Sequence, residues 1–470
     1  MISKFFQEIV DILAELFKKQ ESWLILFLLG VGGLTIVALP SIGVFAAVST
    51  AIRFVAYFWW FWLFLIIVPM LESTWLFWKQ EVFKKSLKFI LLEIKIPRII
   101  EKSPQAMEQV LANLHTLRNA PGDVSERYRE GEVTVWFSLE IASFGGEVHF
   151  YIRCQKKQKN LVEAAVFSYY PDAELNEVPD YASDFPQTVE EMYATGKDMW
   201  GTEMVLTKDE AYPIKTYVAF ESMDDEKKFD PISTFLEVLG KLKTGEIVAM
   251  QFLIAPGDDS WMKKWSGTLK KLKEPETISV AGGEAGDKKQ MPVMRSPGQY
   301  AVLEAVERNL SKPAFDTLIR FCYISPKEIF YDSFARRGLV GAFRQYASLD
   351  LNGLRQNYMV STRTQVWYWP HIFPKIRNEF KKQRLLVSYI KRDIPPETWM
   401  GRVLTSKLFN WNFVSYRFKM NTEGIASLFH LPTSLVLTAP HIKRSDSRKG
   451  GPPAGLPIFG GETEVKKFYE

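Results

Sequence analysis

Two uncharged stretches, WLILFLLGVGGLTIVAL at residues 23–39 and FVAYFWWFWLFLIIVPML at residues 54–71, decide how this chain is organised. Each approaches the roughly 20 apolar residues that a helix needs to cross the hydrocarbon core of a bilayer. The residues PSIG at 40–43 are typical of a turn, so we expect a turn within residues 40–53. The sequence therefore predicts a transmembrane helical hairpin over residues 23–78. A pair of buried core helices is the alternative.

Positive charge flanks this hairpin on both sides. Lysines precede it, lysines and an arginine follow it, and only Arg53 lies between the two apolar stretches. Because Lys and Arg collect on the cytoplasmic side, we expect a multi-pass protein of the cell (inner) membrane with both termini in the cytoplasm. Residues 1–22 have apolar side chains at helical spacing. This favours an amphipathic helix in the membrane interface over a cleaved signal peptide, with a helical extension of the first crossing as the alternative.

The composition of the remaining chain is that of a globular protein. Its 470 residues leave room for two or three domains beyond the membrane anchor. The net charge is only +5, but residues 172–260 are strongly acidic and residues 336–392 are strongly basic. Such asymmetry indicates either charged partners and neighbouring subunits or two solvated faces of one fold. Cys154 and Cys322 both lie in expected strands, which fits a reducing compartment without a disulfide framework.

Residues 79–180 have the periodicities of strands and helices in the order β-α-β-β-α-β. Ser103-Pro104 is a good helix start, and Gly145-Gly146 is a two-residue hairpin turn. The order is that of the ferredoxin-like split βαβ pattern. We expect strands at 92–96, 133–141, 148–154 and 173–178, and helices at 104–117 and 161–169.

A second α+β unit is expected over residues 199–346, after an acidic and irregular connection at 179–198. Its order echoes the first unit, so a divergent internal duplication is one interpretation. The expected segments are strands at 214–220, 246–255 and 314–324, helices at 230–242, 261–273, 299–310 and 327–346, and a flexible insertion at 274–297. The predicted fold class is α+β: the helical hairpin, a ferredoxin-like βαββαβ unit and this second, divergent α+β unit.

Residues 347–431 form a basic aromatic region that we expect to be mainly helical, and residues 432–470 form a Pro/Gly-rich tail or linker. Basic side chains interleaved with aromatic rings suit nucleic acid or anionic lipid. The alternative is that the aromatic rings belong to the core. The candidate contact residues are Arg355, Arg363, Trp367, Trp369, Lys375, Arg377, Lys381, Lys382 and Arg384.

Motifs for catalysis or metal binding do not stand out. The glycine-rich residues 282–289 have the wrong spacing for a P-loop, and the five histidines form no HExxH motif. Glu140 and Glu147 flank a hairpin and form either a facing carboxylate pair or two solvated strand residues. His115 is expected to pack rather than to bind a metal. We therefore expect no enzyme, no cofactor and no metal site.

Several segments resemble one family. They are WLFWKQEVFKKSLKFILLEIKIPR (75–98), PQAMEQVLANLH (104–115), FSLEIASFGGEVHFYIR (137–153), YYPDAELNEVPDY (169–181), MNTEGIASLFHLP (420–432) and RKGGPPAGLP (448–457). The chain is similar, over about residues 75–457, to the membrane-anchored amino-terminal region of type IV secretion coupling-type proteins, the FtsK/HerA/TraG-like class of candidate phyla radiation bacteria. In that class the region precedes a hexameric, DNA-handling ATPase. This sequence stops at Glu470 with no ATPase following, which departs from that arrangement.

The resemblance implies a non-catalytic, membrane-anchored component of a type IV secretion or conjugation-like translocation machine. Such a component would dock or position a separate DNA-handling ATPase of the HerA/TraG type. A membrane-tethered nucleic-acid-binding module is the alternative function. The expected partners are the membrane, that ATPase, DNA and further copies of this chain.

Overall fold

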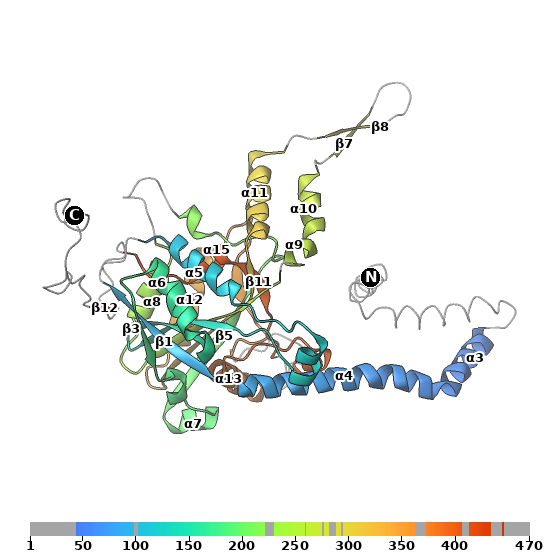
Figure 1. Ribbon diagram of the computed structural model, residues 1–470, viewed down its shortest axis with the longest axis horizontal. Helices are drawn as coiled ribbons and strands as arrows, with labels where there is room; N and C mark the ends of the chain where they lie inside the picture. Colours follow the sequence, from blue (N-terminus) through green and yellow to red (C-terminus); the bar gives the residue numbers. More distant parts are fainter. Residues whose placement is uncertain are drawn as a thin grey trace, which may run out of the picture. The chain divides into compact units, whose positions relative to one another are not determined.

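The computed structural model divides the protein into two compact units, Met1–Trp75 and Leu76–Glu470. It describes residues 44–97, 102–220, 230–258, 260–274, 277–281, 288–292, 295–362, 373–406, 413–433 and 444–445 (Figure 1).

The described part of the first unit is helical. Helix α3 spans Val44–Tyr57, and helix α4 spans Trp59–Ser86 and continues into the second unit. Residues 44–53 of the range in which the turn was expected are helical, and the remaining residues of that range, 40–43, lie outside the described residues. Among the described residues, α4 is the one helix long and apolar enough to cross a membrane. The expected interfacial helix at 1–22 and first crossing at 23–39 lie outside the described residues.

A large, almost wholly antiparallel sheet forms the centre of the second unit. Its strands pair in the order β10-β5-β9-β6-β2-β3-β1, while β4 and β12 also pair with β1, and β11 pairs with β9. Among the strand pairs that the structure describes, only the short β1–β12 contact is parallel. The strands are β1 Phe89–Pro97, β2 Phe137–Phe144, β3 Glu147–Gln155, β4 Glu174–Val178, β5 Lys197–Leu206, β6 Ile247–Pro256, β9 Ala314–Pro326, β10 Leu354–Gln356, β11 Phe418–Asn421 and β12 Arg444–Ser445.

Helices cover both faces of this sheet, so the fold class is α+β, as predicted. The α-helices of the second unit are α5 Pro104–Thr116, α6 Lys159–Tyr169, α7 Val189–Ala194, α8 Ser233–Gly240, α9 Ser260–Lys264, α10 Ser266–Lys273, α11 Pro297–Ser311, α12 Asp332–Arg344, α13 Pro374–Lys391, α14 Trp399–Leu404 and α15 Thr422–Leu428. The main core packs α5, α6, α8, α12 and α15 against one face. A second core packs α7 and α13 against the other.

The first half of the sheet contains every element that we expected over residues 79–180. The chain runs β1-α5-β2-β3-α6-β4, and the strands pair in the order β4-β1-β3-β2. Ser103 caps α5 by accepting a hydrogen bond from the Gln105 N–H. Gly145 and Gly146 form the β2–β3 turn with positive φ angles of 58° and 98°, a conformation that favours glycine.

The second half repeats this strand order. The chain runs β5-α8-β6, then α11-β9-α12-β10, and the strands pair in the order β10-β5-β9-β6. Strands β6 and β2 pair with each other and join the halves, with Ala142 opposite Ala249. Where the first half has its two-residue turn, the second half has an arm of α9, α10, the hairpin β7 Thr277–Ala281 and β8 Lys288–Pro292, and α11 (Figure 1).

One expectation for the second half is wrong. The strand expected at 214–220 is instead a short 3₁₀ turn, Tyr217–Ala219. The Lys215 N–H bonds the Tyr346 carbonyl and the Tyr217 N–H bonds the Ser427 hydroxyl, so neither donor is available to a strand. The strand lies earlier, at β5. The insertion at 274–297 contains the β7–β8 hairpin within its described residues.

The last turns of α4 are fixed to the second unit by close backbone packing. Gly131 has a φ of 74°, and a Cβ added to it would lie 2.5 Å from the Lys79 carbonyl carbon. Leu76 is buried, and Phe89 packs against Trp136 at a ring distance of 5.4 Å. The last turns of α4 therefore pack directly against other residues of the second unit.

Candidate functional site

Helix α15, within the stretch MNTEGIASLFHLP, is fully buried in the second unit. All seven of its residues are buried. Asn421 caps it by accepting a hydrogen bond from the Gly424 N–H. The preceding strand, β11, pairs with the start of β9. A short helix enclosed in this way places its polar side chains at fixed positions.

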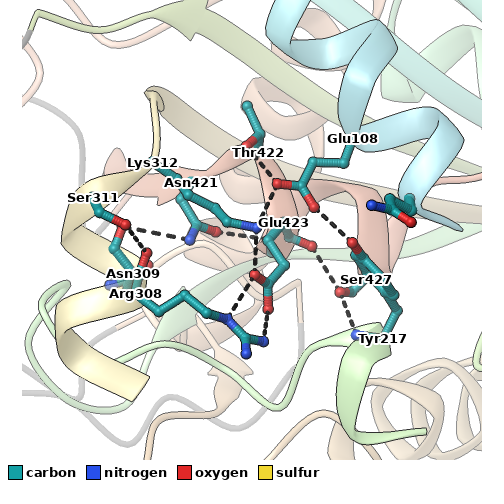
Figure 2. Close-up of polar contacts among 12 residues, drawn as sticks. Glu108, Tyr217, Arg308, Asn309, Ser311, Lys312, Asn421, Thr422, Glu423 and Ser427 are labelled. Atoms are coloured by element: carbon teal, nitrogen blue, oxygen red, sulfur yellow. Dashed lines mark hydrogen bonds and ion pairs between the residues drawn. The ribbon is translucent and has the colours of Figure 1, made fainter. Parts of the chain in front are cut away.

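The carboxylate of Glu423 contacts two cationic side chains, Arg308 at the end of the arm and Lys312 directly after it (Figure 2). Arg308 donates to both of its oxygens, at 3.1 Å from Nε and 2.7 Å from Nη2. The Lys312 ammonium lies 2.6 Å from Glu423 Oε2 and 2.6 Å from Glu108 Oε1. Lys312 therefore bridges a carboxylate on α5, in the first half, and a carboxylate on α15.

Neutral donors complete the same cluster. The Tyr217 hydroxyl donates to Glu108 Oε2 at 2.7 Å, and the Thr422 hydroxyl donates to Glu108 Oε1 at 3.3 Å. The Ser427 hydroxyl donates to the Glu423 carbonyl and accepts from the Tyr217 N–H (Figure 2). We call this set the carboxyl-terminal clamp: Glu108, Tyr217, Arg308, Lys312, Thr422, Glu423 and Ser427.

The electrostatics of the clamp favour the ionised carboxylate. Burial raises the pKa of Glu423, but the hydrogen bonds from Arg308 and Lys312 lower it by more, so the net pKa falls below its ordinary value. The hydrogen bond to Glu423 likewise raises the pKa of Arg308. The clamp thus holds paired, opposite charges in place.

A second carboxylate holds the segment just after α15. Asp230 Oδ1 lies 2.8 Å from His430 Nε2, and Asp230 Oδ2 accepts from the N–H and the hydroxyl of Thr433 at 2.9 and 2.8 Å. Burial raises the pKa of Asp230, but His430 and Thr433 outweigh it and lower the pKa to about 2. Residues 430–433 are therefore tied to the start of the α8 region.

The opposite face of the sheet carries a row of buried polar and charged side chains. Glu140, Gln251, Arg320 and Glu203 are register neighbours on β2, β6, β9 and β5. Arg392 follows α13 and donates to both Glu140 oxygens, at 3.0 and 3.1 Å. Arg320 donates to Glu203 at 2.9 and 3.1 Å and to the Ser388 carbonyl. These contacts lock α13 onto the sheet.

This row corrects the expectation for the β2–β3 hairpin. Glu140 does not form a carboxylate pair with Glu147, and it is not solvated, because it is fully buried against Arg392. Glu147 is exposed, 3.7 Å from His149. His115 packs edge-on against the Phe315 ring, as predicted. Within the described residues, no group of three or more His, Cys, Asp or Glu side chains is placed to hold a metal ion.

The structure describes six of the nine residues predicted to contact nucleic acid or lipid. Arg363, Trp367 and Trp369 lie outside the described residues. Arg355 on β10, and Lys375 and Arg384 on α13, are exposed and stay candidates for such contacts.

The other three predicted contacts, Arg377, Lys381 and Lys382, are buried, so their assignment as surface contacts is wrong. Lys382 lies 2.6 Å from Asp198, and Lys381 donates to the Tyr358 carbonyl at 3.2 Å. Burial lowers the pKa of Lys381 to about 8. The error arises because α13 packs against a face of the sheet, and the sequence pattern does not show that this helix is covered there.

The clamp itself was missed by the sequence analysis. Glu108 lies on an amphipathic helix and Lys312 directly after one, at positions where charged side chains are usually solvated, and Glu423 follows the capping residue Asn421 at the start of α15. One signal was available: Arg308 lies in the last turn of α11 and Lys312 directly follows this helix, so two cationic side chains four residues apart can converge on one carboxylate.

A family match found by comparison with known proteins begins and ends within strands of the sheet. No curated protein matches the sequence. A family model described as "Domain of unknown function (DUF8128)" matches residues 91–444, from within β1 to the start of β12, and these two strands pair with each other. Because the match spans well over half of the chain, this protein belongs to the DUF8128 family.

Proposed function

We propose that this protein is a non-catalytic, membrane-anchored component of a type IV secretion or conjugation-like translocation machine. In this role it docks or positions a separate DNA-handling ATPase of the HerA/TraG type. The resemblance of residues 75–457 to the membrane-proximal region of coupling-type proteins motivates the proposal. Further copies of the chain and DNA are the other partners that the resemblance implies.

One structural observation carries the proposal. The sheet unit holds the last turns of a membrane-type helix at one end of its sequence and, at the other, the residues that lead into the Pro/Gly-rich tail. Helix α4 leads into β1 after a two-residue connection, with Gly131 packed on its Lys79 backbone. The carboxyl-terminal clamp and Asp230 fix the segment that leads into the tail. This arrangement suits a rigid spacer between a bilayer and a docked partner.

We infer that each half of the sheet has a ferredoxin-like fold and that the halves arose by internal duplication. The shared pairing orders, β4-β1-β3-β2 and β10-β5-β9-β6, support this inference. In the second half, the arm from α9 to α11 replaces the hairpin turn. The fold alone implies no activity, so it is compatible with a structural role.

We also propose that the anchor is a transmembrane hairpin in the inner membrane with both ends in the cytoplasm. Helix α4 supports one of the two crossings by its length and composition. Lys79, Lys84 and Lys85 follow its apolar part, and this supports a cytoplasmic position for the sheet unit. The other crossing rests on the sequence of residues 23–39.

Co-purification tests the proposed function. The full-length protein is tagged, extracted from native membranes with mild detergent, and isolated with ATP, with ADP and without nucleotide. We expect a translocation ATPase to be recovered by mass spectrometry in at least one of these states. Recovery of this protein without such an ATPase in all three states would overturn the docking role.

A further inference from the structure

Helices α5 and α6 together present an outer surface without exposed charge. The two helices pack side by side, and their inner faces contribute to the main core (Figure 1). Both helices are described throughout. The exposed residues of α5 are Gln105, Gln109, Asn113 and Thr116, and those of α6 are Asn160, Leu161, Ala164, Phe167 and Ser168. We call this set the neutral face.

The charged side chains of these two helices are directed away from the neutral face. Glu108, the one carboxylate of α5, is buried in the carboxyl-terminal clamp. On α6, Lys159 and Glu163 are half-buried and lie 4.0 Å from each other. Helix α12, on the same side of the sheet, instead exposes Arg337 and Arg344. A charge-free exterior is therefore a particular property of the α5–α6 pair.

This composition selects the kind of partner that the neutral face can bind. DNA and anionic lipid are held by cations, and the neutral face exposes none. Leu161 is 54% exposed and Phe167 is 39% exposed. Depletion of charge around exposed apolar and aromatic side chains is typical of the centre of a protein–protein interface. The chemistry of the neutral face therefore fits another protein surface that is itself uncharged.

Charges of both signs surround the neutral face at its two ends. Arg118 follows α5 and Lys157 precedes α6, and both are exposed; Lys157 lies in the field of Glu132. At the other two helix ends, Lys102 precedes α5 and Asp172 follows α6, and both are exposed. A rim of one sign would repel an identical rim, whereas a rim with both signs can pair with a copy of itself.

From these observations we infer that the neutral face is the contact between two copies of this chain. A two-fold dimer sets the same surface patch against itself, so an uncharged centre meets an uncharged centre and a rim of mixed sign meets the same rim. Leu161 and Phe167 supply the apolar contacts at the centre. The inference deepens the proposed function, in which further copies are partners, by naming the surface through which they meet.

Self-association of the full-length, detergent-solubilised protein tests this contact. Analytical ultracentrifugation over a range of protein concentrations compares the wild type, Leu161→Glu and Met262→Glu. Met262 is the matched control, because it is a similarly exposed apolar residue, at 47%, but lies on α9, outside the neutral face. Both positions are exposed, so both variants should keep the thermal unfolding midpoint of the wild type.

We expect the wild type and Met262→Glu to form dimers of equal strength. Leu161→Glu should raise the dimer dissociation constant by about tenfold or more, because the contact would then bury an unpaired charge. A wild type that stays monomeric would overturn the inference. A dimer that Leu161→Glu weakens no more than Met262→Glu does would overturn it as well.

The outcome is separable from that of the proposed docking role, because self-association is measured without the ATPase. A dimer that depends on Leu161, in a protein that recovers no translocation ATPase, would uphold this inference and overturn the docking role. A monomeric wild type that recovers the ATPase, with less recovered by Leu161→Glu, would assign the neutral face to that partner and overturn the contact between copies.

Discussion

Lys312 and Glu423 form an ion pair of 2.6 Å that joins the arm to the buried helix α15, although 111 residues separate them in the sequence. The same ammonium also contacts Glu108 on α5. One side chain therefore connects an element from each half of the sheet with the segment that leads to the tail. Removing it should have consequences that an ordinary surface lysine would not have.

We expect Lys312→Met to lower the free energy of unfolding by about 2–3 kcal/mol, because two buried carboxylates lose their shared cation. Lys273→Met is the matched control, since Lys273 also forms a 2.7 Å pair but with the exposed Glu307. The control should cost less than about 1 kcal/mol. Urea unfolding of the detergent-solubilised protein measures both. Equal losses in the two variants would mean that the clamp is an ordinary surface pair.

Low pH should weaken the contacts by which Asp230 binds His430 and Thr433 in the segment after α15. Its pKa is about 2 in the folded protein against an ordinary value of 3.8, so its contribution is present above about pH 4 and is lost as the pH falls toward 2. This shift corresponds to about 2 kcal/mol. Glu423, whose pKa is also lowered, adds a loss of the same sign below its ordinary value of 4.5.

The measurement is the free energy of unfolding as a function of pH. We expect Asp230→Asn to be less stable than the wild type at pH 7 and to lose less stability between pH 4 and pH 2. Identical pH profiles for the two proteins would show that protonation of Asp230 does not cause the loss of stability at low pH.

Gly131→Ala should loosen the junction between α4 and the sheet unit. Gly196 is the matched control, because its φ of 70° is close to the 74° of Gly131, but nothing lies within 4 Å of an added Cβ. Gly196→Ala should cost about 1 kcal/mol from the left-handed backbone alone. Gly131→Ala should cost clearly more and should raise hydrogen exchange in residues 76–86. If both variants behave alike, the close packing on Lys79 contributes nothing.

The two cysteines should not react with thiol reagents in the folded protein. Both are buried, and burial raises the pKa of each thiol, so little thiolate is present at neutral pH. A thiol reagent should modify neither residue in native conditions and both in urea. Rapid modification of either cysteine in the native protein would contradict the burial of β3 or β9.

The first half of the sheet was predictable because each element has its own local signal. Ser103 and Pro104 start α5, and Gly145-Gly146 forms the turn between β2 and β3. Strand β5 was missed because it is buried on both faces over most of its length and therefore lacks alternation. The 3₁₀ turn at Tyr217 was mistaken for a strand because its backbone partners come from distant segments.

The candidate site could not be predicted, because its residues meet only through the tertiary fold. Glu108 and Lys312 are 204 residues apart, and Glu140 and Arg392 are 252 residues apart. A charged residue on a strand or helix usually indicates a solvated face. Helix α13 covers the face that carries Glu140, and its own Lys382 turns inward to Asp198. Local patterns cannot show which polar face another element will cover.

The most direct test of the proposed docking role is quantitative co-purification from native membranes. It compares proteins whose carboxyl-terminal clamp is intact with a variant in which the clamp is broken. The tagged wild type, Lys312→Met and Lys273→Met are compared in equal amounts at a temperature where all three are folded. We predict that the wild type and Lys273→Met recover the same amount of a translocation ATPase, and that Lys312→Met recovers less. Recovery of no translocation ATPase by the wild type in any nucleotide state would contradict the account.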